Sequence, residues 1–366
     1  MLSSTLTLLA LGAAGASAAA LGAPVENITQ MKRNIIKRNS LTQGADDATI
    51  LSFALILEHL EDTFYSEALQ KFDDAAFTQA GYPGVYSVLQ QVAKDEHAHV
   101  EFLTAGLKAA GVTSPPQACT YDFGYTDVKS FLGLSQVVEG LGVSAYLGAA
   151  GDIEDASYLT AAGSILTVEA RHNAFVRLVN SYQPAPQPFD TPLSASLVVG
   201  AATPFFKSCP EGSAPTIAAP PALALKSATY QIGGQIQVAP TNASAVNTEQ
   251  TLYCGFASGL QSAFSEYKDG ACTIPTENVT IGQTYLMLTT GPSLADASVV
   301  AGPSILDFST ANISVARSSS NSSSSGNGSS NSSTGSSKAA DTNGASSIVA
   351  GAGFVSVLAG ALSLIF

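Results

Sequence analysis

Residues 95–103 read DEHAHVEFL and residues 166–172 read LTVEARH, and these two stretches decide the fold that the sequence predicts. Each contains a glutamate followed three residues later by a histidine. The pairs are Glu96 with His99, and Glu169 with His172. Three residues span nearly one turn of an α-helix, so each pair lies on one side of its helix and could hold a metal ion. The whole chain has four histidines, so two such pairs are an uncommon coincidence.

The surrounding sequence predicts helices over residues 46–182. Apolar residues recur at steps of three and four, which is the pattern of packed helices in a bundle. The four segments cover residues 54–68, 86–107, 128–149 and 158–176, and stretches containing Gly or Pro separate them. The connection at 112–126 is the longest, and fully extended it reaches about 50 Å, enough to travel the length of a bundle. One class of four-helix bundle has such a crossover between its second and third helices.

Further acidic residues lie on the faces that these helices should bury. Glutamate is almost never fully buried unless it is paired or bound to a cation. The first helix offers Glu58 and Glu61, and the third offers Glu139. Two single glutamates plus two Glu-x-x-His pairs form the ligand set of di-iron and di-manganese bundles. Buried Glu–His hydrogen bonds without metal are the alternative. His59 and His97 lack a glutamate three residues earlier, and we expect them to flank the site or face solvent.

An internal repeat favours Glu58 over Glu61 as the first-helix ligand. In both halves a Glu-x6-Tyr stretch precedes the Glu-x-x-His pair, with Glu58 before Tyr65 and Glu139 before Tyr146. The repeat aligns Glu58 with Glu139, while Glu61 remains a substitute ligand. Each tyrosine lies two turns from its glutamate on the same helix face. Its hydroxyl could therefore hydrogen-bond a ligand carboxylate, although ordinary packing in the core is an equally good interpretation.

Four segments resemble a known family. They are LEHLEDTFYSEAL (57–69), DEHAHVEFL (95–103), VKSFLGLSQVVEGLGVSAYLGAA (128–150) and LTAAGSILTVEARH (159–172). They are similar to the ferritin-like domain of fungal secreted stress-response and sexual-development proteins. The similarity covers roughly residues 45–210, including PQPFDTPLS before KSCP. It implies a ferritin-like fold with the following ligands: Glu58 or Glu61, Glu96, His99, Glu139, Glu169 and His172. It implies little about the reaction.

The predicted class is α+β. A ferritin-like four-helix bundle occupies residues 45–210, and a short fifth helix within 193–206 could close it. A β-rich domain follows at 220–310, where short runs of strand formers alternate with turn residues and predict a small β-sandwich. The clearest runs are 229–232, 235–238, 251–253 and 283–288.

The four cysteines predict two disulfides, because an even number is typical of an oxidising compartment. Three pairings are possible. We favour Cys254–Cys272, which are close in sequence, and Cys119–Cys209, which would tie a loop to the end of the helical region. The net charge of −13 argues against nucleic acid as a partner.

Both ends of the chain read as targeting segments. Residues 1–20 predict a signal peptide, and 21–44 a pro-segment or a disordered arm. Residues 318–347 form a Ser/Asn/Gly-rich stalk, which is too polar to fold. Residues 348–366 are apolar and uncharged with no basic residue behind them, which favours a glycosylphosphatidylinositol (GPI) signal over a membrane-spanning helix. Candidate attachment sites are Ser336, Ser337, Asn343 and Gly344.

Seven N-x-S/T sequons support export, because N-glycans are added to exposed loops of secreted proteins. They begin at Asn27, Asn242, Asn278, Asn312, Asn321, Asn327 and Asn331. None lies between residues 28 and 241, which fits a compact helical domain in that region.

Two functions remain open at this point. A carboxylate-rich site favours two Fe or Mn ions, which could react with oxygen or peroxide in a ferroxidase-like or catalase-like enzyme at a cell surface or wall. The alternative is a non-enzymatic, glycosylated surface protein of stress or development in which the bundle is structural. Storage of iron in a cage fits less well, because a C-terminal domain, glycans and a lipid anchor would obstruct a closed shell. The fold alone does not choose between them.

Overall fold

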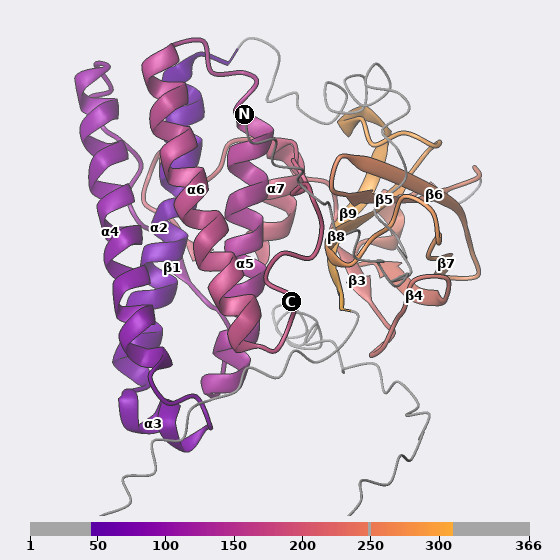
Figure 1. Ribbon diagram of the computed structural model, residues 1–366. Helices are drawn as coiled ribbons and strands as arrows, with labels where there is room; N and C mark the ends of the chain where they lie inside the picture. The colour runs from indigo at the N-terminus through magenta and orange to yellow at the C-terminus, as the bar shows by residue number, and fades with distance from the viewer. Residues whose placement is uncertain (1–44, 248–249, 310–366) are drawn as a thin grey trace, which may run out of the picture.

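The computed structural model describes residues 45–247 and 250–309, and it divides into a helical bundle and a β-rich domain that pack side by side (Figure 1). The α+β class is therefore confirmed. The signal peptide, the pro-segment, the stalk, the C-terminal tail and five of the sequons (Asn27, Asn312, Asn321, Asn327 and Asn331) lie outside the described residues. Within the described residues, no helix combines the length and the apolar character that crossing a membrane requires.

Four long helices form the bundle, as predicted. They are α2 (Asp47–Lys71), α4 (Val85–Ala109), α5 (Val128–Ala149) and α6 (Ala156–Val179). Aspartate caps define three of the starts, because the carboxylates of Asp46, Asp127 and Asp155 accept hydrogen bonds from free N–H groups of the first turn. The short α3 (Asp74–Gln79), which the sequence analysis missed, turns the chain between α2 and α4. The predicted fifth helix is α7 (Ala195–Ala202).

The long crossover joins α4 to α5, and it pairs with the segment that follows α7. Its strand β1 (Thr120–Tyr121) pairs antiparallel with β2 (Phe206–Ser208). The Cys119–Cys209 disulfide lies beside this pairing, as the sequence predicted. Aromatic rings from the crossover pack against α2 and α5, with Phe123 edge-on to Phe64. In the bundle, α2 packs mainly on α4, and α5 mainly on α6.

The β-rich domain is one antiparallel sheet and not two stacked sheets. Its strands are β3 (Leu223–Leu225), β4 (Gln235–Pro240), β5 (Tyr253–Ser258), β6 (Gln261–Lys268), β7 (Ala271–Thr273), β8 (Gly282–Thr289) and β9 (Val299–Phe308). They lie in the order β3-β4-β7-β6-β5-β8-β9, and β3 also contacts β9, so the sheet nearly closes around its own apolar core. The strand expected at 229–232 is instead a loop and turn before Gly233, whose φ is +83°. The predicted Cys254–Cys272 disulfide joins β5 to β7.

A row of backbone carbonyls on α5 links the bundle to the rest of the chain. Each accepts a hydrogen bond from outside the helix, and they are spaced four residues apart, on one face. The four bonds are Asn180 Nδ2 to Leu132 O, Asn173 Nδ2 to Gln136 O, Tyr285 Oη to Gly140 O, and Leu193 N to Ser144 O. Close by, the buried Arg177 of α6 donates to both carboxylate oxygens of Asp307 in β9. The β-rich domain is thus fixed directly to the helices.

Removing the Cys119–Cys209 disulfide should weaken the protein more than removing Cys254–Cys272. The two bridges close loops of 90 and 18 residues, and the chain-entropy estimate gives about 4 to 5 kcal/mol for the longer loop and about 1 kcal/mol less for the shorter. Double Cys→Ser variants compared by urea unfolding would measure both effects. Equal losses of unfolding free energy from the two double variants would contradict this estimate.

Candidate metal centre

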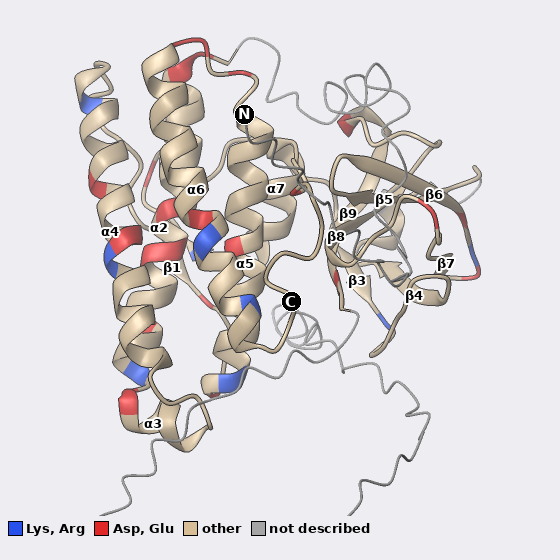
Figure 2. Cartoon of the chain, in the orientation of Figure 1, with Lys and Arg blue, Asp and Glu red and all other residues tan. Residues whose placement is uncertain are grey.

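Six side chains that the sequence singled out converge in the middle of the bundle, where the acidic residues of the helices gather (Figure 2). Glu58, Glu96, Glu139 and Glu169 have no exposed surface, and His99 and His172 are 9% and 7% exposed. Four helices contribute to the cluster, and each ligand candidate lies near the centre of α2, α4, α5 or α6. Burial of four carboxylates in one core is costly unless something compensates their charge.

The donor atoms form two overlapping groups, each with its atoms within 4.8 Å of one another. One group is Glu58, Glu96, His99 and Glu169, and the other is Glu96, Glu139, Glu169 and His172. Glu96 and Glu169 belong to both groups. Because these two glutamates come from the two Glu-x-x-His pairs, the repeat in the sequence becomes an approximate two-fold symmetry in the structure.

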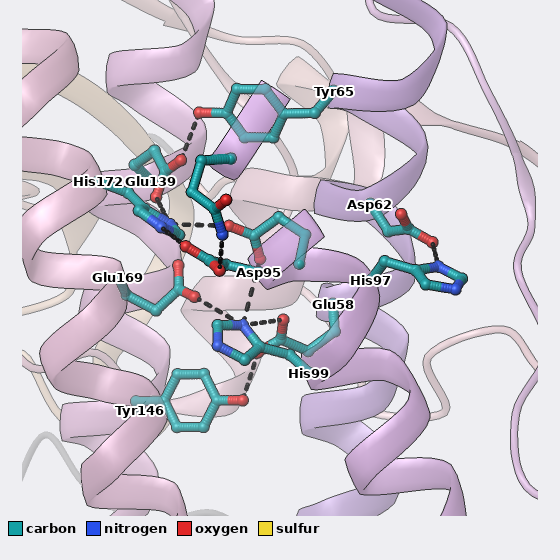
Figure 3. A network of polar contacts seen from close by, with 12 residues as sticks. Glu58, Asp62, Tyr65, Asp95, His97, His99, Glu139, Tyr146, Glu169 and His172 are labelled. Carbon is teal, nitrogen blue, oxygen red and sulfur yellow. Dashed lines mark hydrogen bonds and ion pairs between the residues drawn. The ribbon is translucent and has the colours of Figure 1, made fainter. Parts of the chain in front are cut away.

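The two histidines face the cluster with the same ring nitrogen (Figure 3). His99 Nδ1 lies 3.2 Å from both Glu58 Oε2 and Glu169 Oε1. His172 Nδ1 lies 2.9 Å from Glu96 Oε1 and 3.7 Å from Glu139 Oε2. In the described structure, His172 Nδ1 has no aligned hydrogen-bond partner despite these short distances.

Asp95 holds the opposite side of the His172 ring, a role that sequence analysis missed. Its Oδ2 lies 3.3 Å from His172 Nε2. A carboxylate in this position favours the tautomer that carries its proton on Nε2 and leaves the lone pair of Nδ1 directed into the cluster. Asp95 directly precedes Glu96, but nothing in the sequence signals a contact between α4 and α6 at this point.

Each of the two tyrosines donates a hydrogen bond to a glutamate in the other half of the repeat. Tyr65 of α2 donates to Glu139 Oε1 of α5, and Tyr146 of α5 donates to Glu58 Oε1 of α2. They lie on opposite sides of the cluster (Figure 3). Each hydroxyl therefore contacts a candidate ligand, although in both cases the ligand belongs to the other half of the repeat.

Glu61 is buried but lies in neither donor group, so the geometry favours Glu58, as the repeat predicted. The remaining two histidines are elsewhere. His59 Nε2 lies 3.0 Å from the carbonyl oxygen of Pro116 in the crossover. His97 is exposed, with Nδ1 3.4 Å from Asp62 Oδ2. Neither takes part in the cluster, in agreement with the absence of a preceding glutamate.

Several carboxylate oxygens of the cluster have no hydrogen-bond partner among the described residues. They are both oxygens of Glu96 and of Glu169, Oε2 of Glu139 and Oε2 of Glu61. Buried acceptors of this kind require a proton or a cation. Gly142 leaves room beside them, because a Cβ at this position would lie 3.2 Å from Glu169 Oε2. Carboxylate and imidazole donors of this number fit a pair of Fe or Mn ions.

The pKa shifts of the cluster residues without metal also indicate that the cluster requires positive charge. Burial, together with the charges of Glu169 and Glu96, raises the pKa of Glu58 to about 8. Burial and the charge of Glu96 raise the pKa of Glu169 to about 7. Burial opposes the charged form of His99, but its contacts with Glu169, Glu58 and Glu96 outweigh this and raise its pKa to about 12. Protons would therefore neutralise the cluster in the metal-free protein.

An apolar pocket of about 50 Å³ lies at the end of the bundle where α2 begins and α4 ends. Its lining includes Leu51, Phe102, Ala162 and the ring of Tyr146. Because the Tyr146 hydroxyl donates to Glu58, this side chain reaches from the pocket to the cluster.

Comparison with known proteins agrees with the helical part of the structure. Residues 46–181 match the family described as "Ferritin-like domain". "Protein rds1" of Schizosaccharomyces pombe is 28% identical over 165 residues, which are 45% of this chain and 40% of that protein, so the chain spans less than half of its relative. A crystal structure of a conserved hypothetical protein from Mycobacterium tuberculosis is 22% identical and covers 38% of this chain and 99% of its own, with a TM-score of 0.33.

The metal-free protein should lose stability as the pH rises. A group whose pKa is raised by folding stabilises the fold below its ordinary pKa, and this contribution is lost as the pH rises through the folded value. For Glu58 this window runs from 4.5 to about 8, and for His99 from 6.5 to about 12. We expect the melting temperature in a chelator to be lower at pH 8 than at pH 5, by about 5 °C.

Added Mn²⁺ should reverse this trend, because metal ligands bind as deprotonated groups. The metal-induced rise in melting temperature should therefore be larger at pH 8 than at pH 5. The Glu58→Gln variant serves as the control, and its melting temperature in chelator should depend less on pH. A flat profile for the unsubstituted protein would show that protons do not neutralise the cluster.

Proposed function

We propose that the bundle, whose residues 46–181 match a ferritin-like domain, binds two Fe or Mn ions and that the protein is a metal-dependent oxidoreductase acting on oxygen or peroxide. The observation that carries the proposal is the set of buried carboxylate oxygens without a hydrogen-bond partner at the centre of the described bundle. Four carboxylates carry four negative charges, which two divalent ions would balance. A metal pair, when bound, would change oxidation state and so exchange electrons with oxygen or peroxide in ferroxidase-like or catalase-like chemistry.

Each ligand candidate has a distinct role in this proposal. Glu96 and Glu169 belong to both donor groups and would contact both ions. Glu58 with His99 would complete one ion's shell, and Glu139 with His172 the other.

The surrounding residues hold these ligands in place. Tyr65 and Tyr146 fix the orientation of the two outer carboxylates, and Asp95 fixes the ring of His172. The apolar residues around the cluster exclude bulk water, which strengthens each electrostatic contact. These contacts would therefore keep the ligand side chains in place when the charge of the bound ions changes.

A structural role for the cluster is the second candidate. The tyrosine–carboxylate bonds and the ion pairs of His99 and His172 all form without an ion. With some glutamates protonated, this network could fix the register of the four helices by itself. In that case the protein would be a non-enzymatic surface protein.

We also propose that the protein is exported and held at the cell surface by a GPI anchor. The composition of residues 1–20 and 318–366 supports this, and so do the two disulfides, which persist in oxidising compartments. Asn242 and Asn278, the two sequons in the described part of the chain, are both exposed and could carry glycans.

Replacing either histidine of the cluster with alanine should abolish binding of the metal pair. Each imidazole nitrogen lies against the carboxylates of one donor group, so its loss leaves that ion with too few ligands. Elemental analysis of His99→Ala and His172→Ala, followed by turnover of oxygen and peroxide, would measure this. The exposed His97→Ala is the matched control and should keep both ions. An unsubstituted protein that folds but binds no metal would favour the structural role.

Phospholipase treatment of intact cells should release the protein into the medium. Such an enzyme cuts a lipid anchor but leaves a membrane-spanning helix in place. Immunoblots of supernatant and cells would report the distribution, with a known lipid-anchored protein as the control. Retention of this protein after release of the control would contradict the anchor.

A further inference from the structure

The repeat places a glutamate and a glycine at equivalent positions beside the cluster. Glu61 follows Glu58 by three residues, and Gly142 follows Glu139 by three residues. Because Glu58 and Glu139 are matched in the two donor groups, Glu61 and Gly142 are matched as well. The two halves of the site therefore differ by one carboxylate.

Glu61 and Gly142 lie against each other in the structure. A Cβ built on Gly142 would lie 2.6 Å from Glu61 Oε1 and 3.2 Å from Glu169 Oε2. A real side chain does not approach another atom so closely. The carboxylate of Glu61 thus lies beside Glu169, in space that exists only because residue 142 has no side chain.

Glu61 also lacks the compensation that a buried carboxylate needs. It is 3% exposed, and its Oε2 has no hydrogen-bond partner among the described residues. Glu169, its neighbour, belongs to both donor groups. Once ionised beside bound cations, a carboxylate at this position would add negative charge to the centre as a whole.

We propose that Glu61 is a fifth carboxylate of the centre and that its charge favours metal ions of higher charge. The inference rests on the proposed metal pair. The four carboxylates of the donor groups balance two divalent ions, and together with the negative charge of Glu61 they would balance one divalent and one trivalent ion. Attraction to Glu61 grows with the charge of the ion, so its loss should weaken trivalent binding more than divalent binding.

Zn²⁺ and Ga³⁺ test this directly, because neither changes its oxidation state. The purified protein and its variants would be loaded with each ion separately. Elemental analysis gives the ions per chain, and competition with a chelator gives the affinities. In Glu61→Gln we expect two Zn²⁺ to remain bound with little change in affinity, while the affinity for Ga³⁺ falls by about tenfold or more.

Gly142→Ala provides an independent variant, since its methyl group would displace the Glu61 carboxylate. Alanine is a better helix former than glycine, so the change favours α5 itself. We expect the same selective loss of Ga³⁺. Glu67→Gln, an exposed carboxylate on the same helix as Glu61, is the matched control and should change neither affinity. Circular dichroism would verify that each variant folds.

Each outcome separates the two proposals. An unsubstituted protein that binds neither ion would reject the proposed metal pair together with this inference. An unsubstituted protein that binds two ions, with Glu61→Gln keeping the same preference between Zn²⁺ and Ga³⁺, would reject the role of Glu61 alone. Loss of both Zn²⁺ ions in Glu61→Gln would identify Glu61 as a primary ligand in place of Glu58, and would also overturn the inference.

Discussion

The rest of the structure depends on the burial of five carboxylates within one bundle. Glu58, Glu61, Glu96, Glu139 and Glu169 are each at most 3% exposed. Their mutual repulsion in a poorly polarisable core opposes packing of the helices unless protons or cations intervene. Folding and neutralisation of this cluster are therefore linked. The tyrosines that cross between the halves, and the histidines that face the carboxylates, reduce that repulsion without removing it.

The β-rich domain contributes to this arrangement through α5. That helix carries Glu139 and Tyr146 on the side of the cluster. On another side its carbonyls accept hydrogen bonds from Tyr285, from Leu193, from Asn173 of α6 and from Asn180, which caps α6. A helix held at four successive turns cannot slide or rotate freely. The position of Glu139 is therefore set by contacts on both sides of its helix, and some of these come from more than a hundred residues later in the chain.

The sequence predicted the parts of the structure that depend on local spacing. The Glu-x-x-His pairs, the helix periodicity and the position of Glu58 relative to Glu139 are all readable because helical geometry fixes which residues share a face. Contacts between distant segments were not predictable in this way. Asp95 meets His172 only through the packing of α4 on α6. No sequence motif indicates that the missing side chain of Gly142 leaves space for the Glu61 carboxylate. At 229–232 the strand formers were misleading, since Tyr230 packs its ring on Phe308 from a loop.

The Cys119–Cys209 bridge divides the ligands in a way that bears on damage to the chain. Glu139, Glu169 and His172 lie inside the covalent loop that it closes, whereas Glu58, Glu96 and His99 precede it. A protease that cuts once in the exposed turn between α5 and α6 would leave two fragments still joined through sulfur. Both fragments would remain at a high effective concentration, and their ligands could reassemble. A nicked molecule would thus keep its whole ligand set, and the two fragments would separate only after reduction of the bridge as well.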